Sequence, residues 1–333
     1  LGNSVGTGPK GILAEIIELK GLVEIQEHKD EIAGKIVFFN GPMDPTLIET
    51  FSAYGAAVSQ RSSGAAQTGP YGAKAIIVRS MTQSLDDVPH AGSLRYEAGV
   101  KPLPAMAIST KDANLLSKLL KDQDDLRIYM ENYAEMLPET QSFNVIGQIN
   151  GTLLPNEYIA VGGHLDSWDV GEGAHDDGSG CLQGIEVLRI FKSLNIKPKR
   201  TLRAVMWMNE ENGGKGGKAY ADVSKSRNEY HIAAIESDRG GFVPRGFTST
   251  GSTKQKQQLL KWKTLFEPYG LHDFEQEGGG ADINPLSNQG TLLIGLLPDG
   301  QRYFRYHHTK EDVFETVNRR ELELGAGSMA SLV

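Results

Sequence analysis

The sequence is poor in cysteine, in long apolar runs and in clustered positive charge. Its single cysteine, Cys181, excludes an intramolecular disulfide framework and a metal site built from clustered thiolates. No stretch reaches the roughly 18 apolar residues that a membrane-spanning helix needs, so no membrane span is predicted. The net charge of -8 and the absence of a basic run exclude nucleic acid as an expected partner. No HExxH helix and no Walker A loop is present either.

The length of 333 residues is too great for one ordinary hydrophobic core and predicts two domains. With 39% hydrophobic and 23% charged residues, the composition is typical of a globular protein. The chain opens at Leu1 without a methionine or a signal-like segment. We therefore expect a processed or truncated product with further residues upstream.

The first 132 residues carry little recognisable chemistry. Residues 1–22 are rich in glycine and predict a connector. After them, strands are predicted at 35–39, 75–78, 104–108 and 126–130, and helices at 46–58 and 112–120. No group of His, Cys or paired acids occurs in residues 21–132, and the isolated His28 and His90 are predicted at the surface. We interpret this block as a non-catalytic module.

Chemistry is concentrated in residues 158–180, YIAVGGHLDSWDVGEGAHDDGSG. An apolar run stops at His164, Asp166 follows, and a glycine-rich loop then brings Asp176 and Asp177. An imidazole with nearby carboxylates is a suitable donor set for a divalent cation. A helix predicted at 178–194 would place these residues at the carboxyl end of a strand, where α/β sheets bind ligands. Taken alone, the stretch is equally compatible with a solvated acidic loop.

Several later strands are also followed by acidic residues, and this recurrence decides between the two interpretations. The predicted strand 201–208 is followed by Glu210 and Glu211, and the strand 231–235 by Glu236 and Asp238. A glycine-rich stretch with an acid (278–282), a strand (291–297) and a histidine pair with a downstream acid (306–312) complete the pattern. Strands of consecutive α/β units end at one rim of a sheet, so these side chains are expected to converge there. The sequence therefore favours a metal site.

Five residues form the predicted ligand set: His164, Asp176, Glu211, Asp238 and His308. With one bridging carboxylate and one bridging hydroxide, each of two metal ions would have three protein ligands and one solvent oxygen. Three carboxylates and a hydroxide also balance two dications, whereas a single dication would leave costly negative charge. Two metals about 3.5 to 4 Å apart would activate a water molecule for amide hydrolysis. Glu210 or Glu211 would act as general acid/base, and spacing alone does not decide which.

Taken together, these motifs, GGHLDSWD, DD, NEE, ESD and HHT with a later Asp, resemble the M28 family of co-catalytic zinc peptidases, most closely its carboxypeptidase Q branch. The resemblance covers nearly the whole chain in order. It implies two Zn²⁺ ions per chain, one held by His164 and Asp238, the other by Glu211 and His308, with Asp176 as the bridge. It also implies Glu210 as general acid/base and Asp166 as the partner that orients His164.

The same resemblance implies an α/β fold of the phosphorylase/hydrolase-like zinc exopeptidase type, a three-layer αβα mixed sheet with a smaller inserted β/α domain. Residues 1–20 and 133–333 would form the catalytic domain, and residues 21–132 a protease-associated (PA) domain. Asp282 and His307 would border the substrate pocket. An extracytoplasmic location, secreted or periplasmic, is expected by likeness, and a homodimer is possible in this family.

Some alternatives stay open in the sequence. His175 competes with the loop acids as a ligand, although a solvent-facing position is favoured; His307 competes with His308, and Asp177 with Asp176. The expected substrate is a small peptide, cleaved by aminopeptidase, carboxypeptidase or dipeptidase action. A substrate carboxylate could be held by one of four arginines, Arg239, Arg245, Arg302 and Arg305. A one-zinc glutaminyl cyclase-like acyltransferase and a receptor-like binding protein without metal are the competing functions.

Overall fold

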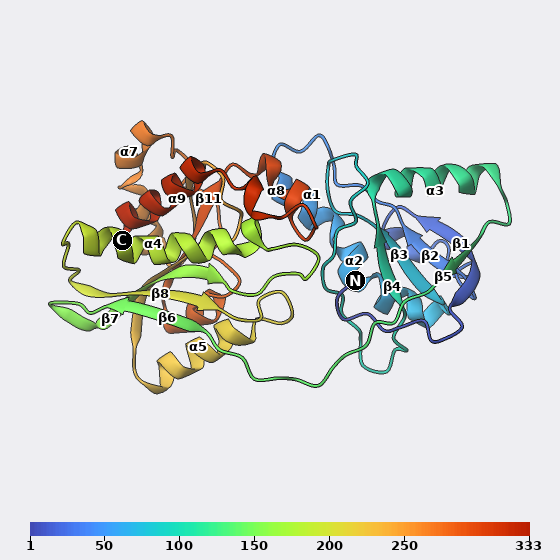
Figure 1. Cartoon of the computed structure of the whole chain (residues 1–333), viewed down its shortest axis with the longest axis horizontal. Coiled ribbons are helices and arrows are strands. Elements are labelled where there is room, and N and C mark those ends of the chain that lie inside the picture. The colour runs from blue at the N-terminus through green and yellow to red at the C-terminus, as the bar shows by residue number, and fades with distance from the viewer. The chain divides into compact units, whose positions relative to one another are not determined.

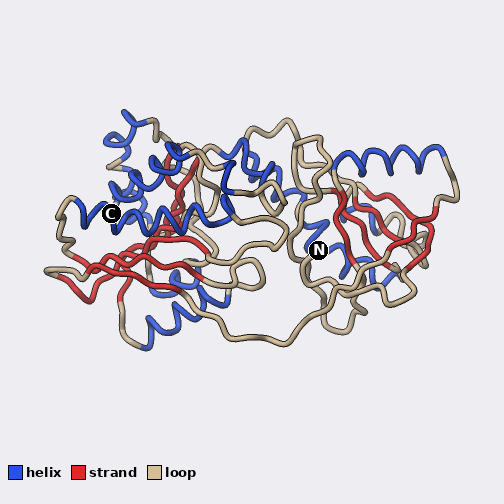
Figure 2. Tube along the Cα trace, viewed as in Figure 1, coloured by secondary structure: helices blue, strands red, loops and turns tan.

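A computed structural model describes all 333 residues and divides into two compact units. The first comprises Leu1–Thr140 and His307–Glu311, and the second comprises Gln141–Tyr306 and Asp312–Val333. Each unit is built on its own β-sheet flanked by helices (Figures 1 and 2). None of the helices combines the length and the apolar character needed to cross a membrane.

The first unit contains a five-stranded sheet with the order β4-β3-β2-β1-β5. The strands are β1 (Ile12–Leu19), β2 (Ile36–Phe39), β3 (Ala75–Arg79), β4 (Ala105–Ile108) and β5 (Arg127–Met130). The first four run parallel and β5 runs antiparallel to β1. The helices are α1 (Thr50–Ala57), α2 (Ser59–Thr68) and α3 (Thr110–Asp122). Ser109 starts α3 by accepting a hydrogen bond from the Asp112 amide.

Two predictions for this unit are wrong. The glycine-rich residues 1–22 do not form a simple connector, because ILAEIIEL at Ile12–Leu19 forms β1 in the middle of the first sheet, with Ala14, Ile16 and Leu19 buried. The first compact unit of the structure begins at Leu1. His90 is 1% exposed, so it is a buried residue and not a surface histidine.

The second unit contains a mixed six-stranded sheet with the order β10-β11-β9-β7-β8-β6. The strands are β6 (Val145–Ile149), β7 (Leu154–His164), β8 (Arg200–Trp207), β9 (Tyr230–Glu236), β10 (Pro244–Thr250) and β11 (Leu292–Pro298). Strands β11, β9, β7 and β8 are parallel, whereas the edge strands β10 and β6 are antiparallel to their neighbours. The predicted strands therefore do share one sheet, with β7 between β8 and β9.

Adjacent residues of the central strands point to opposite faces of this sheet, and each face has its own core. Val161, Ala204 and Ile235 contribute to one core, which includes Val187 of α4 (Ser179–Ser193) and Met329 of α9 (Arg319–Leu332). Their neighbours Ala160, Val205 and Ala234 contribute to the other, which includes Tyr220 of α5 (Lys215–Ser226). The second unit is thus a three-layer αβα structure (Figure 1). Three short helices, α6 (Thr253–Leu260), α7 (Lys263–Phe266) and α8 (Tyr303–Tyr306), complete it.

This topology creates a switch point at the carboxyl end of β7. The chain leaves β7, passes through α4 on one face and enters β8, then leaves β8 through α5 on the opposite face and enters β9 on the other side of β7. Loops that diverge in this way leave a crevice beyond the strand ends, where open α/β sheets bind their ligands. His164 is the last residue of β7 and lies at this point.

Candidate metal centre

Four of the five predicted ligands meet at the switch point of the second unit. The His164 Nε2 atom lies 3.2 Å from Asp176 Oδ1 and 3.4 Å from Asp238 Oδ1. Possible ligand atoms of His164, Asp176 and Glu211 all lie within 4.8 Å of one another. The side chains of His164 and Asp176 are 1% and 5% exposed, whereas that of Asp238 is 26% exposed. The cluster is therefore nearly closed, with its accessible side at Asp238.

His164 is oriented through the backbone of Asp166. The His164 Nδ1 atom lies 2.7 Å from the Asp166 carbonyl oxygen, so Nδ1 carries a proton and donates it there, and Nε2 faces the carboxylates. The Asp166 carboxylate has a different task. Its Oδ1 accepts hydrogen bonds from the amides of Asn209 (2.6 Å) and Glu210 (3.0 Å), and its Oδ2 from that of Glu211 (3.3 Å). Asp166 thereby connects the end of β7 to the loop that carries the two glutamates.

Asp177 uses its carboxylate to hold the backbone. Its Oδ2 accepts a hydrogen bond from the His164 amide (3.0 Å), and its Oδ1 one from the Gly180 amide (2.9 Å). Burial raises the pKa of this carboxyl well above its usual range. A Cβ atom on Gly163 would lie 1.9 Å from Asp177 Oδ2, and one on Gly180 would lie 2.5 Å from it. These bonds favour Asp176 over Asp177 as the metal ligand, although Asp177 also lies close to His164 and Asp238.

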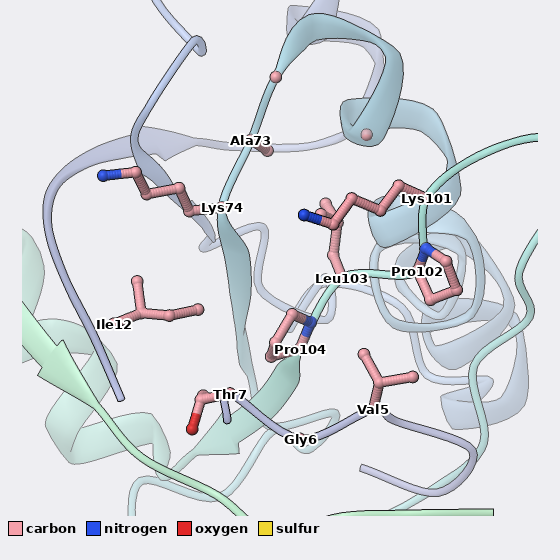
Figure 3. A pocket seen from close by; sticks show the side chains of 12 residues that line it. Val5, Gly6, Thr7, Ile12, Ala73, Lys74, Lys101, Pro102, Leu103 and Pro104 are labelled. Carbon is pink, nitrogen blue, oxygen red and sulfur yellow. The ribbon is translucent and has the colours of Figure 1, made fainter. Parts of the chain in front are cut away.

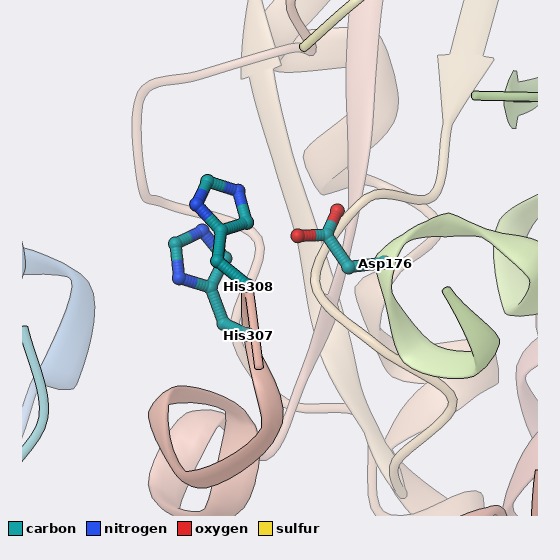
Figure 4. A group of neighbouring side chains, drawn as sticks. All are labelled: Asp176, His307 and His308. Atoms are coloured by element: carbon teal, nitrogen blue, oxygen red, sulfur yellow. The ribbon is translucent and has the colours of Figure 1, made fainter. Parts of the chain in front are cut away.

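The loop that carries Asp176 is fixed by Asp312. The Asp312 Oδ1 atom accepts a hydrogen bond from the His175 amide (2.7 Å), and Oδ2 accepts one from the Asp176 amide (3.1 Å). Asp312 is 3% exposed, so water competes little for these bonds. The Asp176 side chain extends from this loop immediately before α4 (Figure 4). The sequence placed Asp312 behind the histidine pair but gave no sign of this contact.

His175 is not the solvent-facing histidine that the sequence favoured. It is fully buried, with its ring stacked on Phe242 at 4.3 Å and on Tyr306 at 5.1 Å between centroids. Its Nδ1 atom accepts a hydrogen bond from the Gly241 amide (3.2 Å). Burial lowers the pKa of His175 to about 4. The ring therefore packs as a neutral aromatic group behind the loop.

The two glutamates after β8 have different surroundings. The Glu211 Oε2 atom accepts a hydrogen bond from the indole nitrogen of Trp168 (2.6 Å), and Glu211 belongs to the group around His164. Glu210 is not a member of that group. Burial raises the pKa of Glu210 to about 8, and the charges of Asp238 and Glu211 act in the same direction. This arrangement favours Glu211 as ligand and Glu210 as the proton carrier.

Another acidic pair, Asp282 and Glu236, is buried near the cluster. Asp282 is 1% exposed, and neither of its carboxylate oxygens has a hydrogen-bond partner. Glu236 is equally buried and accepts one bond, from the Ile283 amide (2.9 Å). Burial raises the pKa of Glu236 well above its usual range and that of Asp282 to about 7. The role of Asp282 in a substrate pocket stays a prediction.

The histidine pair belongs to the first unit. The rings of His307 and His308 stack at 3.5 Å between centroids (Figure 4), and His307 also meets the ring of Tyr54 edge-on at 5.2 Å. The assignment of His308 as the fifth ligand stays a prediction from the sequence. The first unit also holds a cavity of about 710 Å³, lined mainly by apolar groups with Lys74, Lys101 and Thr7 (Figure 3). No acidic residue or histidine lines it.

The donor set in the second unit fits a divalent cation. His164 donates its Nδ1 proton to a carbonyl, and its Nε2 atom faces two carboxylate oxygens. Lone pairs that converge in a buried place repel one another unless a proton or a cation lies between them. Nitrogen and oxygen donors of this kind, with one side open, are the ligands of catalytic zinc sites.

Comparison with known proteins agrees with this chemistry. The sequence profile of "Peptidase family M28" matches residues 144–332. Carboxypeptidase Q of Bos taurus is 34% identical over 330 residues, which cover 99% of this chain and 68% of that protein. A crystal structure of a peptidase M28 precursor from Shewanella amazonensis is 33% identical and superposes with a TM-score of 0.92, covering 99% of this chain and 75% of that one.

A more distant structure shows how far the fold extends. BSAP, a zinc aminopeptidase from Bacillus subtilis, is 20% identical with a TM-score of 0.66 over 99% of this chain and 76% of its own, which establishes a shared fold only. The profile match covers more than half of the chain, and the carboxypeptidase Q match covers nearly all of it. The chain therefore belongs to peptidase family M28 and is a metallopeptidase of that family.

Proposed function

We propose that the chain is a co-catalytic dizinc exopeptidase that hydrolyses small peptides with free termini. The convergence of His164, Asp176, Glu211 and Asp238 at one switch point is the observation that carries this proposal. In this proposal, His164 and Asp238 would hold one Zn²⁺, Glu211 and His308 would hold the other, and Asp176 would be shared by both. The three carboxylates match the charge of two dications better than that of one.

A pair of zinc ions held there would acidify a water molecule and polarise the peptide carbonyl. The chain's own residues do the rest. Glu210 accepts the proton of the attacking water and delivers it to the departing amine. Its raised pKa suits this task, because a group that titrates near neutral pH can both take up and release a proton. Asp166 holds the backbone amide of Glu210 and so fixes where its side chain starts.

The substrate end that is cleaved forms part of the proposal. Relatives carry the name carboxypeptidase Q, which favours a free carboxylate on the substrate. Arg239 follows the ligand Asp238 directly in the chain and is our candidate for the carboxylate-binding cation. We further propose that the insertion is PA-like, that the enzyme acts outside the cytoplasm and that it can form a homodimer.

The first experiment counts zinc in three proteins. Elemental analysis of the wild type should give about two zinc ions per chain. Glu210→Gln should keep both ions and lose about 10²- to 10⁴-fold in kcat, whereas Glu211→Gln should lose one ion. A wild-type value near one ion would favour the one-zinc acyltransferase instead. If Glu211→Gln keeps both ions and Glu210→Gln loses one, the two roles are exchanged.

A second experiment determines from which end of the peptide the enzyme removes a residue. Free dipeptides, N-blocked dipeptides and aminoacyl amides are compared as substrates of the zinc-loaded protein. Cleavage of free and N-blocked dipeptides, without cleavage of amides, is expected for a carboxypeptidase. Cleavage of aminoacyl amides and free dipeptides, without cleavage of N-blocked dipeptides, would instead make the protein an aminopeptidase. Arg239→Met should raise KM for free and for N-blocked dipeptides alike, since it removes the charge partner of the carboxylate that both kinds of substrate carry.

A further inference from the structure

His308 and Ala91 hold each other through two hydrogen bonds inside the first unit. The Ala91 amide donates to the His308 carbonyl oxygen (2.8 Å), and the His308 Nδ1 atom lies 3.3 Å from the Ala91 carbonyl oxygen. The two residues are 217 positions apart in the sequence. Both the backbone and the ring of His308 are therefore tied to the same residue.

This contact is supported by a buried arginine. The Arg61 Nη1 atom donates to the Ala91 carbonyl oxygen (3.1 Å), the same atom that faces His308, and Nη2 donates to the Tyr54 hydroxyl (2.6 Å). Arg61 is 6% exposed. A Cβ atom on Gly92 would lie 2.3 Å from the guanidinium carbon, so the chain passes close over Arg61. The Ala91 carbonyl consequently has little freedom to turn away.

The backbone of His308 makes such a restraint necessary. Its φ angle is 62°, in the left-handed region that residues other than glycine rarely adopt. Residues held in that region persist where the surroundings determine the conformation, and they are concentrated at functional sites. Here the hydrogen bond from the Ala91 amide to the His308 carbonyl is a restraint of this kind.

We infer that Arg61 is a positioning residue: through the Ala91 carbonyl it fixes the His308 ring with its proton on Nδ1, so that Nε2 is the nitrogen available for a metal. A histidine that binds a metal with one nitrogen commonly donates the other N–H to a carbonyl or carboxylate, which sets the tautomer and the ring orientation. This inference rests on the proposed function, in which His308 is a ligand.

The tautomer is measured by NMR on protein labelled with ¹⁵N-histidine. In the zinc-loaded wild type, His308 should be protonated on Nδ1, and in Arg61→Met this signal should broaden or shift as the carbonyl is released. Tyr54→Phe is a milder variant that removes only the hydroxyl partner of Arg61, and it should shift the signal less. His308 protonated on Nε2 in the wild type would overturn the inference.

Metal affinity provides an independent measurement. Zinc dissociation constants are obtained by chelator competition for the wild type, Arg61→Met, His308→Ala and the double variant. Arg61→Met should weaken binding of one zinc about 10- to 100-fold, and it should have no further effect once His308 is alanine. Arg79→Met is the matched control, because Arg79 is a half-buried arginine of the same unit that contacts Asn40 and Asn114. It should leave both constants unchanged.

The outcomes separate the two proposals. If His308→Ala leaves zinc binding intact, the ligand assignment fails, and the NMR tautomer still shows whether Arg61 fixes the ring. If His308→Ala loses a zinc ion but Arg61→Met and Tyr54→Phe, both folded by thermal melting, bind zinc as the wild type does, the positioning role of Arg61 is wrong. Equal weakening by Arg61→Met with and without His308 would also contradict it.

Discussion

The two units place polar residues at the carboxyl ends of parallel strands, yet the two sets have opposite electrostatic character. In the first unit, Glu18 near the end of β1 accepts hydrogen bonds from Asn40 (2.6 Å) and Ser117 (2.9 and 2.8 Å), and Arg79 at the end of β3 donates to Asn40 (3.1 Å). In this set, groups of both charges and neutral polar groups pair with one another. In the second unit, several carboxyl groups surround the single imidazole of His164. Only the second set needs a cation from outside.

This contrast explains why similar strand ends differ in chemistry. A parallel sheet offers the position, and the balance of donors and acceptors decides whether the position is closed by the protein or left for a ligand. The comparison can therefore be tested by substitutions that remove a charge from the paired residues of the first unit or from the acidic cluster of the second unit.

Removal of metal should make the second unit strongly sensitive to pH. Burial raises the pKa of Asp282 from 3.8 to about 7, so the metal-free fold prefers the protonated form and loses stability as pH rises from about 4 to about 7. This difference corresponds to about 4 kcal/mol for Asp282 alone. Urea unfolding of chelator-treated protein at pH 4, 6 and 8 measures it. Asp282→Asn should reduce the pH dependence, and a metal-free protein equally stable at all three values would contradict the idea.

A charge pair of the second unit, Arg203 and Glu229, should stabilise the fold when its carboxylate is ionised, which is the opposite of the behaviour expected of Asp282. The Arg203 guanidinium donates to Glu229 (2.7 Å), and both side chains are nearly buried, at 8% and 11% exposure. Glu229→Gln should lower the free energy of unfolding by about 3 kcal/mol at pH 7, because it leaves a buried guanidinium without its counter-charge. Glu157→Gln, in the more exposed pair with Arg200, is the control and should cost less than about 1 kcal/mol.

The stabilisation by the Arg203–Glu229 pair should depend on pH in a definite direction. Burial alone would raise the pKa of the Glu229 carboxyl. The hydrogen bonds and the charge of Arg203 outweigh this effect and lower the pKa below its usual 4.5. The contribution of the Glu229 carboxylate is therefore present above pH 4.5 and is lost as pH falls through the lowered pKa. The difference in unfolding free energy between wild type and Glu229→Gln should shrink in that acidic range. A difference that grows on acidification would contradict the assigned pair.

Asp312→Asn should affect activity more than stability. The substitution keeps one acceptor oxygen but turns an NH₂ group toward one of the two loop amides, so Asp176 loses part of its support. We expect kcat/KM to fall about 10- to 100-fold, with weaker zinc binding in chelator competition. Glu186→Gln removes an exposed pair with Arg189 on α4 and should leave both quantities unchanged. An Asp312→Asn protein with wild-type zinc affinity and activity would rule out this role.

The smallest effect is expected at the balanced strand ends of the first unit. Although burial opposes the shift, hydrogen bonds from Lys20, Asn40 and Ser117 lower the pKa of Glu18. Glu18→Gln keeps an acceptor there, so the unfolding free energy should fall by about 1 kcal/mol or less. Zinc content, kcat and KM should not change. A loss of zinc in this variant would show that the two units are not chemically independent at this point.

The parts of the site that could be predicted from the sequence are those encoded locally. His164, Glu211 and Asp238 follow apolar runs directly, and those runs became the neighbouring strands β7, β8 and β9. A strand that ends in a ligand-type residue is visible in a short window of sequence, and parallel pairing then brings the ends together. For the same reason, the strand positions of the second sheet were largely predictable, apart from β10, which lacks a long apolar run.

The remaining features depend on contacts between distant residues. Asp312 supports Asp176 across 136 positions, and Ala91 meets His308 across 217. No pattern within a window of sequence reports such a contact. The buried state of His90 and the pairing of β1 were missed because polar or glycine-rich neighbours suggested a loop, whereas tertiary packing decided the outcome.

The close packing around the Asp177 side chain limits which substitutions the site can accept. Its carboxylate fits only because positions 163 and 180 have no side chain, and alanine at Gly163 would press on this acid, which supports the histidine. Alanine at Gly180 would also meet the Ser237 carbonyl oxygen at 1.8 Å. A side chain at Gly163 therefore requires a change at Asp177, whereas Gly180 is fixed by the backbone as well as by that acid. Variants selected for new activity should accept changes around the open side at Asp238 well before they accept any at Gly163 or Gly180.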